Sequence, residues 1–283
     1  MKKVLVTGGC GFIGYALSSE LIKRGYAVDI VDNLSIGYEA KNPKVIGANF
    51  LGGDVRAMNN IKDNSYNYIF HLAAFSRVWL SYENQTYTFS TNVDGTKSVL
   101  EYAKRNGCKV IFASSSSVHH SISPYSTSKR MGEELCRFYR DGLGVDITIV
   151  RLYNVYGPGE LVESHMAALL GRWRNQINNN LPITYHNLGT HLKPFTHIDD
   201  VIIGLIKLIK TKEINRNGWE LGSDNSYSVH QVYKMFEERF PNIKVEKIVD
   251  VSGTYSIARR KDNEVIRLGW FPKDRLKEYI DSL

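Results

Sequence analysis

Cysteine is scarce in this sequence, and long apolar runs are missing from it. Cys10, Cys108 and Cys136 are the only cysteines among 283 residues, and they show neither metal-site spacing nor a disulfide framework. We therefore expect a reducing, cytoplasmic setting in which each thiol acts as a small, partly buried side chain. The apolar stretch 201–209 is interrupted by Lys207 and is shorter than a bilayer requires, so no membrane contact is expected.

Clustered charge is also missing, although the chain is basic overall. Its formal net charge is +7, yet the basic clusters at 23–24, 104–105 and 259–261 lie far apart in the sequence. No basic stripe alternates with aromatic residues, which argues against nucleic-acid binding and favours a basic enzyme acting on anionic nucleotides. His119 and His120 are adjacent, so on an extended segment their side chains would point apart. They have no acidic or thiol partner close in sequence, and we expect no metal site.

What the sequence does contain begins with a glycine-rich turn between a strand and a helix. The apolar run 4–6 predicts a buried parallel strand, and an amphipathic helix is expected from Phe12 onward. Between them, Gly8, Gly11 and Gly14 allow a tight turn through which the backbone approaches a phosphate closely. The helix would direct unpaired N–H groups and its positive dipole end at a pyrophosphate. Taken alone, the glycines are equally consistent with an ordinary glycine-rich loop.

An acidic residue after the second expected strand favours a cofactor-binding role for the glycine-rich turn. The apolar strand 27–31 ends at Asp32, where a carboxylate accepts hydrogen bonds from an adenosine ribose and repels a 2′-phosphate. Residues 33–37 contain no basic side chain that would bind such a phosphate. Asp32 could be an ordinary loop acid, but its position after the strand favours the cofactor role. The combination predicts dinucleotide binding, with NAD and not NADP as the cofactor.

Strand-like and helix-like segments alternate along the first part of the chain. The expected strands are 4–7, 27–31, 48–51, 68–72, 110–113 and 147–152. The expected helices are 12–24, a long one within 86–105, and one that starts near residue 125. This alternation favours right-handed crossovers and a parallel sheet with helices on both faces, which is a doubly wound α/β fold.

The regular alternation loosens after Gly157, which indicates a second part of the molecule. We expect residues 1–157 to form the dinucleotide-binding domain and residues 196–222 to return to it. Residues 158–195 and 223–283 are expected to form a smaller C-terminal α/β lobe that binds the substrate.

The second chemical signal is a serine run followed by a tyrosine and a lysine. Serines 114–117 follow the expected strand 110–113, and Tyr125 and Lys129 would share one face of a helix. An ammonium near a phenol favours the phenolate and lowers its pKa, which makes tyrosine a usable general base or acid. A nearby serine hydroxyl can hold the substrate oxygen and relay the proton. The pair alone could be a surface helix pair, but its place after a dinucleotide fold favours catalysis.

Further segments match the same pattern. They are DNL at 32–34, GDVR at 53–56, HLAA at 71–74, TNVDGT at 91–96, RLYNVYGPG at 151–159, FTHIDD at 195–200 and LGW at 268–270. With the glycine turn and the serine run, they resemble the extended short-chain dehydrogenases/reductases, in particular the NAD-dependent sugar-nucleotide epimerase/dehydratase branch. The resemblance implies a Rossmann fold, an NAD cofactor and a nucleotide-diphosphate sugar as the substrate.

The resemblance also implies which residues contact the cofactor. These are Gly8, Gly11, Phe12, Ile13, Asp32, Asn33, Asp54, Val55, Leu72, Ala73, Ala74, Asn92, Tyr125, Lys129 and Tyr153. Asp54 and Val55 would flank the adenine. Asn92 would lie beside the nicotinamide, unless it only ties a strand to a helix.

Catalytic and substrate-binding positions follow from the same resemblance. The implied catalytic residues are Ser115, Tyr125 and Lys129, and the implied substrate contacts are Ser76, Ser115, Asn154 and Lys193. Tyr125 would be the acid and base, while Lys129 would bind the nicotinamide ribose and tune Tyr125. Asn154 would hold the diphosphate of the substrate.

The substrate half departs from the family pattern in three places. Ser115 and Tyr125 are only ten residues apart, where relatives have a longer loop, so we expect either a more open sugar site or a wall supplied by other segments. Lys193 replaces an arginine, and a lysine can neutralise a phosphate but cannot clamp it with a fork. Residues 251–254 replace an arginine-proline-glycine-aspartate stretch. The arginines at 259–260 could contribute the missing charge, but surface solvation is their expected role.

The residues after Ser115 bear on the type of reaction. Dehydratases of this branch have an acidic pair after the catalytic threonine, and its sugar-acid decarboxylases have a glutamate two places on. Here Ser116 and Ser117 follow, and neither is a carboxylate. Epimerisation at carbon 4 needs only hydride removal, rotation of the ketosugar and hydride return, for which Ser115, Tyr125 and Lys129 suffice. The expected activity is therefore NAD-dependent nucleotide-sugar 4-epimerisation.

Other activities stay open at this point. An NAD(P)H-dependent nucleotide-4-ketosugar reductase would use the same residues but would release its cofactor after each turnover. Another sugar-nucleotide dehydratase or dehydrogenase of the family is a further alternative. A catalytically silent NAD-binding regulator is favoured by the altered substrate half and opposed by the complete set of Ser115, Tyr125 and Lys129.

A homodimer is expected from the resemblance as well. Relatives commonly pack the helix near 91–105 and the helix that begins near Tyr125 into a four-helix bundle. The candidate apolar stripe comprises Val99, Tyr102, Leu135, Phe138 and Tyr139, which could equally face the protein's own sheet.

Overall fold

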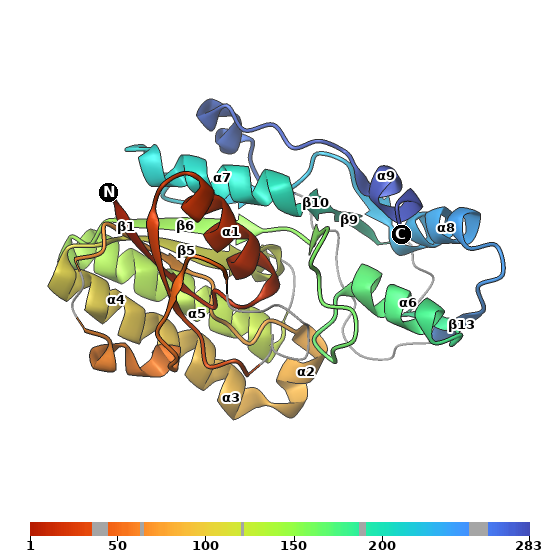
Figure 1. Cartoon of the computed structure of the whole chain (residues 1–283), viewed down its shortest axis with the longest axis horizontal. Helices are drawn as coiled ribbons and strands as arrows, with labels where there is room; N and C mark the ends of the chain where they lie inside the picture. Colours follow the sequence, from red (N-terminus) through yellow and green to blue (C-terminus); the bar gives the residue numbers. More distant parts are fainter. Residues whose placement is uncertain (36–44, 63–64, 120–121, 187–190, 249–259) are drawn as a thin grey trace.

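Seven parallel strands form the central sheet of the computed structural model (Figure 1). The model describes residues 1–35, 45–62, 65–119, 122–186, 191–248 and 260–283, and the strand count refers to these ranges. In spatial order the strands are β11 (Trp219–Leu221), β6 (Ile147–Leu152), β5 (Lys109–Ser115), β4 (Tyr68–His71), β1 (Lys3–Thr7), β2 (Ala27–Val31) and β3 (Asn49–Phe50). The direction of winding reverses between β1 and β4, and ligands bind at such a point in open α/β sheets.

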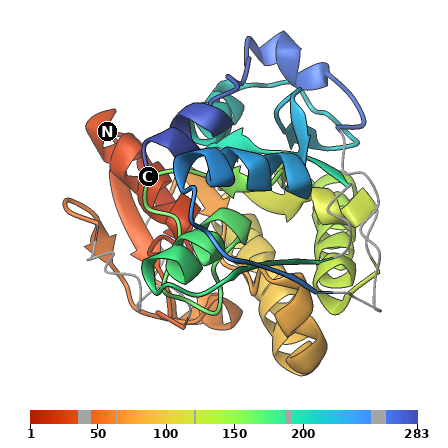
Figure 2. The same cartoon turned by 90° about the vertical axis from the view of Figure 1, so that its right-hand side faces the viewer.

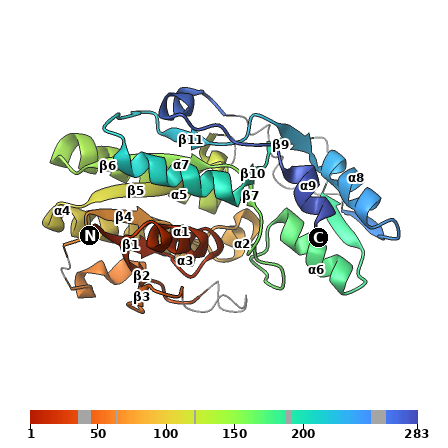
Figure 3. The same ribbon diagram turned by 45° about the horizontal axis from the view of Figure 1, so that its top comes forward.

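Helices cover both faces of this sheet, as the alternating sequence pattern predicts (Figure 3). On one face, α1 (Phe12–Lys23) and α7 (Ile198–Lys210) bury Leu17 and Leu205. On the other face, α4 (Gly95–Asn106) and α5 (Pro124–Arg137) bury Leu100 and Cys136. Apolar residues predominate in most of these strands because both faces of the sheet are covered, although Asp29, Arg151 and Glu220 are buried there as well. The predicted doubly wound α/β fold is confirmed by these layers.

The long helix expected within residues 86–105 is interrupted. It consists of α3 (Gln85–Phe89), a wider π-type turn at Ser90–Asp94, and α4. A short helix, α2 (Val78–Glu83), precedes α3. None of the described helices has both the length and the apolar character that crossing a bilayer requires.

A smaller lobe lies beside the carboxyl ends of the central strands (Figures 1 and 2). Its described elements are α6 (Leu169–Asn178), β8 (Ile183–His186), β9 (Leu192–Pro194), β12 (Ser226–Ser228), α8 (Val229–Arg239), β13 (Val245–Ile248) and α9 (Leu276–Asp281). Strand β8 pairs with β13 in parallel, and β9 pairs with β12 in antiparallel. Trp173, Phe236 and Ile280 form part of its own buried cluster.

Segments from the second part of the chain also pack on the larger domain. Strand β11 extends the central sheet beyond β6, and β10 (Thr196–His197) pairs with β7 (Val155–Tyr156). Val265 and Trp270 join the buried cluster of α7, and the Trp270 indole donates to the Asp200 carbonyl at 2.7 Å. This part of 223–283 therefore differs from the expectation that the whole segment belongs to the lobe.

Candidate active site

A cavity of about 860 Å³ lies between the carboxyl ends of the central strands and the smaller lobe. Its wall includes residues that follow β1, β2, β4, β5 and β6. The predicted site residues that line it are Gly8, Gly11, Phe12, Ile13, Asp32, Asn33, Val55, Leu72, Ala73, Ala74, Ser76, Ser115, Tyr125, Lys129, Asn154 and Lys193. The fold thus brings most of the predicted cofactor and substrate positions to one space.

The glycine-rich turn has no room for side chains. A Cβ on Gly14 would lie 2.1 Å from the Gly8 carbonyl oxygen, and one on Gly8 would lie 2.7 Å from the Ala73 nitrogen. Gly8 also has a φ of +71°, which glycine adopts without strain. Helix α1 begins without a side-chain cap and without an acid in its first turn. Its N-terminus therefore offers backbone N–H donors and a positive dipole end to an anion.

Asp32 follows β2, and its carboxylate is turned toward the glycine-rich turn. Its Oδ2 accepts a hydrogen bond from the Cys10 N–H at 3.0 Å, and its Oδ1 accepts one from the Leu34 N–H at 2.8 Å. These bonds fix the carboxylate at the cavity wall, and each oxygen retains a lone pair for a ribose hydroxyl. Of residues 33–37, whose lack of basic side chains favoured NAD, 36 and 37 lie outside the described residues.

Asp54 and Tyr153, both predicted at the cofactor, are not among the residues that line the cavity. The Arg56 guanidinium contacts the Asp54 carboxylate, with Nη2 2.6 Å from Oδ2, and these hydrogen bonds lower the pKa of Asp54 to about 2. Asn33 donates to the same oxygen at 3.0 Å. Tyr153 is fully buried. Asp54 therefore holds the local loop together, and Val55 next to it is the residue that reaches the cavity.

Asn92 also lies outside the cavity wall, where its amide connects two segments. Its Oδ1 accepts from the Phe75 N–H at 2.8 Å, and its Nδ2 donates to the Phe75 carbonyl at 3.1 Å. The same Nδ2 donates to Ser128 Oγ on α5 at 2.9 Å. This arrangement agrees with the alternative in which Asn92 ties a strand connection to a helix.

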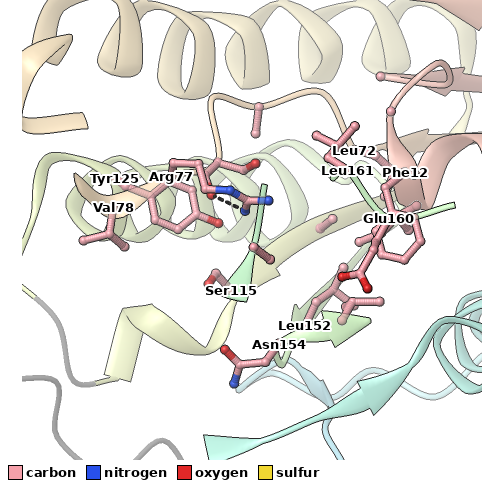
Figure 4. A pocket seen from close by; sticks show the side chains of 18 of the residues that line it. Phe12, Leu72, Arg77, Val78, Ser115, Tyr125, Leu152, Asn154, Glu160 and Leu161 are labelled. Carbon is pink, nitrogen blue, oxygen red and sulfur yellow. Dashed lines mark hydrogen bonds between the residues drawn. The ribbon is translucent and has the colours of Figure 1, made fainter. Parts of the chain in front are cut away.

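Tyr125 and Ser115 lie together at the substrate end of the cavity (Figure 4). Helix α5 begins with a capping box in which Ser123 and Ser126 bind each other's backbone N–H groups. This cap fixes Tyr125 in the first turn of the helix. Burial raises the pKa of the Tyr125 phenol, while hydrogen bonding with Ser115 and the charge of Arg77 oppose that shift.

Lys129 shares a helix face with Tyr125, as the four-residue spacing predicts. Its Nζ donates a hydrogen bond to the Ala113 carbonyl at 2.8 Å and lies 5.2 Å from the centre of the Phe112 ring. Burial lowers the pKa of the Lys129 ammonium to about 8. The cationic charge that opposes the raised pKa of Tyr125 comes from Arg77, whereas the tuning role of Lys129 stays a prediction.

Sequence reasoning missed several ionisable side chains in the cavity wall, among them Arg77, Glu160 and Arg172. Glu160 Oε1 accepts a hydrogen bond from Tyr279 Oη at 2.8 Å, and burial raises the pKa of this carboxyl to about 7. Arg172 belongs to α6, and its Nε is buried without a hydrogen-bond partner within the described ranges. These residues come from three distant segments and belong to no motif, so only their shared cavity reveals them.

The predicted substrate contacts Asn154 and Lys193 lie at the lobe side of the cavity. Asn154 has a φ of +35°, and its Nδ2 donates to the Pro194 carbonyl at 2.8 Å. Burial and then the charge of Arg172 lower the pKa of the Lys193 ammonium. Two mutually repelling cations, Arg172 and Lys193, therefore line a wall suited to a polyanion.

A buried chain of charged groups supports the segment after β5. His119 Nε2 lies 2.6 Å from Glu220 Oε1, which also lies 3.3 Å from Arg151 Nη1. Arg151 in turn forms two hydrogen bonds with Glu133, at 2.8 and 2.7 Å, and Ser114 Oγ donates to Glu133 at 2.6 Å. Glu220 is remote from His119 in sequence, which is why the sequence shows no acidic partner for this histidine.

Arg260 differs from its expected role at the solvated surface. Its side chain is only 5% exposed and forms an ion pair with Asp224. It also packs beside Gly222, where an added Cβ would lie 3.0 Å from Arg260 Cγ. The prediction is wrong because Asp224 and Gly222, both distant in sequence, supply this buried environment; Arg259 lies outside the described residues. Over the described part of the chain, no group of three or more metal-ligating side chains is placed to hold an ion.

Known proteins resemble this chain in sequence and in structure. A model of the NAD dependent epimerase/dehydratase family matches residues 4–222. The UDP-N-acetyl-α-D-glucosaminuronate decarboxylase of Bacillus cytotoxicus is 30% identical over 253 residues, which cover 82% of this chain and 78% of that protein. The UDP-glucuronate 4-epimerase of Thermodesulfobacterium geofontis is 30% identical over 268 residues, covering 84% and 80%. The structure of UDP-glucuronic acid 4-epimerase from Bacillus cereus, in complex with UDP-glucuronic acid and NAD, superposes with a TM-score of 0.86 at 25% identity, covering 99% and 96%.

Proposed function

We propose, because the chain belongs to the NAD-dependent epimerase/dehydratase family, that it is a nucleotide-sugar 4-epimerase. Family membership confirms the predicted resemblance, the enzymatic character and the NAD cofactor. The finer assignment rests on one observation. Ser115 and Tyr125 open into the same cavity as the glycine-rich turn, and the residues that follow Ser115, Ser116 and Ser117, carry no carboxylate.

The cofactor half of the cavity fits NAD. The glycine-rich turn excludes a Cβ at Gly8 and Gly14, so the backbone can approach a pyrophosphate, and α1 directs its N-terminus there. The Asp32 carboxylate is placed for a ribose. NAD, when bound, accepts a hydride from the sugar carbon and returns it.

Tyr125 performs the proton transfer in this proposal. Its Oη removes the proton from the carbon-4 hydroxyl while Ser115 holds the same oxygen. The nearby positive charge of Arg77 favours the phenolate that this step requires. After the ketosugar rotates, the opposite face of carbon 4 would receive the hydride while Tyr125 returns its proton to the carbon-4 oxygen, so the carbon-4 configuration is inverted.

The lobe side of the cavity binds the rest of the substrate. Arg172 and Lys193 neutralise the diphosphate, and Asn154 contacts it from the end of β6. Ser115 and Tyr125 line a cavity of about 860 Å³, in which the ketosugar would rotate.

Proton NMR of the purified protein with NAD and a panel of nucleotide sugars tests this function. We expect an equilibrium mixture of carbon-4 epimers, and Tyr125→Phe should reduce turnover about 10²–10⁴-fold while NAD still binds. Tyr233→Phe on α8, outside the cavity wall, is the matched control and should retain activity. A pentose product would instead indicate decarboxylation, and net NADH consumption would indicate a reductase. Bound NAD without any turnover would favour the silent regulator.

We also propose a homodimer in which α4 and α5 pack against their copies. Val99, Tyr102 and Tyr139 are buried within the chain, so they do not form the predicted apolar stripe. Phe138 and Met131 are 59% and 44% exposed and offer apolar surface on α5 and directly after it. A monomer mass in light scattering at micromolar concentration would reject the dimer. The cytoplasmic setting expected from the cysteine content stays a prediction.

A further inference from the structure

Arg77 presents a positive charge to the cavity without a matching carboxylate. It directly precedes α2, and its Nε donates to the Met166 carbonyl at 2.5 Å while its Nη1 donates to the Ser76 carbonyl at 3.1 Å. Both partners are neutral carbonyl groups, and no acid within the described ranges forms an ion pair with Arg77. A desolvated cation is costly unless an anion accompanies it. The structure therefore leaves an anionic partner to be supplied from elsewhere.

The charge of Arg77 lies beside the reacting hydroxyl and not at the diphosphate site. Figure 4 shows its guanidinium next to the Tyr125 ring, with Asn154 at a different part of the cavity. The Tyr125 N–H donates to Ser81 Oγ at 3.1 Å, which fixes the start of α5 against α2. The guanidinium itself is engaged by the Met166 and Ser76 carbonyls, which hold it beside the phenol.

Glu160 attracts Arg77 electrostatically, but the two groups form no ion pair within the described ranges. Its Oε1 is engaged by Tyr279, and Arg174 lies 3.7 Å away on the same side. Burial raises the pKa of Glu160 to about 7, so near neutral pH a large fraction of this carboxyl is uncharged. Near neutral pH Glu160 therefore supplies only part of a negative charge, which Arg174 and Tyr279 share, and three cations of the cavity exceed it.

Charge matching then indicates a third negative group on the ligand. Arg77, Arg172 and Lys193 line the substrate half, whereas the two phosphates of a nucleotide-diphosphate sugar carry one negative charge each. Arg172 and Lys193 lie together on the lobe side and serve the diphosphate. The remaining cation faces the sugar.

We propose that Arg77 binds a carboxylate on the sugar, and that the substrate is a nucleotide-activated hexuronic acid. Nε and Nη1 donate to carbonyl groups, whereas Nη2 of this cavity-lining guanidinium forms no hydrogen bond within the described part of the chain, and a guanidinium can pair with both oxygens of a carboxylate. In a hexuronic acid the carboxylate is attached to carbon 5, next to the carbon whose hydroxyl Tyr125 deprotonates. The proposal rests on the proposed 4-epimerase function and names its substrate class.

UDP-glucuronic acid and UDP-glucose form the probe pair, since they differ only in a carboxylate against a hydroxymethyl group. We expect wild-type kcat/KM for the acid to exceed that for UDP-glucose by at least about tenfold. Arg77→Gln should lower kcat/KM for the acid about 10²-fold, the loss typical of removing one partner of a desolvated charge pair. Because Arg77 also favours the Tyr125 phenolate, Arg77→Gln should lower kcat/KM for UDP-glucose as well, but by a clearly smaller factor, so the preference for the acid shrinks. Arg77→Lys should retain part of it, and Arg267→Gln, at an exposed position, is the matched control.

A purely structural Arg77 would give a different pattern. If it only joined the Met166 and Ser76 segments, or only tuned Tyr125, Arg77→Gln would lower kcat/KM for both sugars equally, and the proposal would be overturned. A wild-type preference for UDP-glucose would overturn it as well.

Binding separates this inference from the proposed function. In NAD-loaded Tyr125→Phe protein, titration calorimetry should show tighter binding of UDP-glucuronic acid than of UDP-glucose, and Arg77→Gln should abolish the difference. If the wild type turns over neither sugar yet binds the acid preferentially through Arg77, the 4-epimerase function fails and the carboxylate site stands. If the two sugars bind equally to the wild-type and Tyr125→Phe proteins, the carboxylate site is contradicted, while the proposed 4-epimerase function is not.

Discussion

The two halves of the cavity are built from different parts of the polypeptide. In the cofactor half, backbone forms much of the wall, with Gly8 and Gly14 packed so closely that a Cβ would collide with neighbouring backbone. In the substrate half, long side chains such as Arg77, Glu160 and Arg172 reach in from separate segments. The first half needs particular residues at fixed spacing, whereas the second needs only the right charges in the right place.

This difference explains why one half carries motifs and the other does not. A turn that approaches a phosphate restricts consecutive positions, so its glycines recur at recognisable intervals. A side chain that projects into a cavity can come from any neighbouring element, and its sequence position carries little information. The cofactor can therefore be predicted from sequence motifs, whereas the substrate can be inferred only from the side chains that the fold brings together.

We expect the largest difference between the two halves from two glycine substitutions, one affecting NAD binding and the other affecting KM for the nucleotide sugar. A Cβ on Gly14 would lie 2.1 Å from the Gly8 carbonyl oxygen, and one on Gly171 of α6 would lie 1.9 Å from the Leu161 carbonyl oxygen. Each Gly→Ala change should destabilise the protein by about 1–3 kcal/mol, because the backbone must shift. Gly14→Ala should weaken NAD binding more than tenfold, whereas Gly171→Ala should mainly raise KM for the nucleotide sugar.

Fluorescence titration with NAD and steady-state kinetics measure these effects. Gly142→Ala is the matched control, since its Cβ would lie at an ordinary 3.5 Å from the Phe138 ring. If Gly14→Ala leaves NAD affinity unchanged, the glycine-rich turn does not form the cofactor site, and the stated difference between the two halves is wrong.

The buried carboxyl of Glu160 should make the substrate half sensitive to pH. Its pKa of about 7 lies above the ordinary value, so the folded state binds the proton more tightly than the unfolded state. This contribution to stability is present below about pH 4.5 and is lost as the pH rises through 7. Glu160→Gln, which stays neutral, should therefore exceed the wild type in unfolding free energy by about 2–3 kcal/mol at pH 8.

Urea unfolding of the ligand-free protein at pH 4.5 and pH 8 tests this prediction. The difference between Glu160→Gln and the wild type should nearly vanish at the lower pH. Glu163→Gln, at an exposed position of the same segment, serves as the control. Equal stability of the Glu160→Gln variant and the wild type at pH 8 would show that the buried carboxyl is not desolvated.

The smallest expected effects concern two acids of the cofactor half. Asp32→Asn should weaken NAD binding about tenfold, because a charge-assisted hydrogen bond to the ribose is lost, and should narrow the preference over NADP. Asp54→Asn should change NAD affinity less than threefold, since Arg56 already occupies that carboxylate. Titration with both cofactors measures the ratio. If the two variants lose NAD affinity equally, Asp54 contacts the cofactor, as the resemblance implied.

Much of the fold could be predicted from local patterns. The segments that became β1, β2 and β6 are rich in apolar residues because both faces of the sheet are covered, and this leaves a clear signal although Asp29 interrupts β2 and Arg151 interrupts β6. The π-type turn at Ser90–Asp94 left none, since it changes hydrogen bonding within an otherwise helical segment. The packing of Val265 and Trp270 beside α7 depends on long-range contacts that a short sequence window does not contain.

The same distinction between local patterns and long-range contacts applies to the candidate site. Tyr125 and Lys129 share a helix face because of their spacing, and both reach the cavity. The bond between Lys129 and the Ala113 carbonyl was not predictable, because it depends on how closely α5 approaches β5. Arg77 likewise has no sequence signal beyond its nearness to the HLAA segment.

The most direct test of the central claim follows the hydrogen on carbon 4. A nucleotide sugar that carries deuterium at this carbon is incubated with the NAD-loaded protein, and the products are examined by NMR and mass spectrometry. The proposed reaction removes this hydrogen and returns it to the same carbon, so the inverted product should retain the deuterium without net NADH formation. Loss of the label to bulk cofactor, or uptake of solvent hydrogen at carbon 5, would contradict the 4-epimerase.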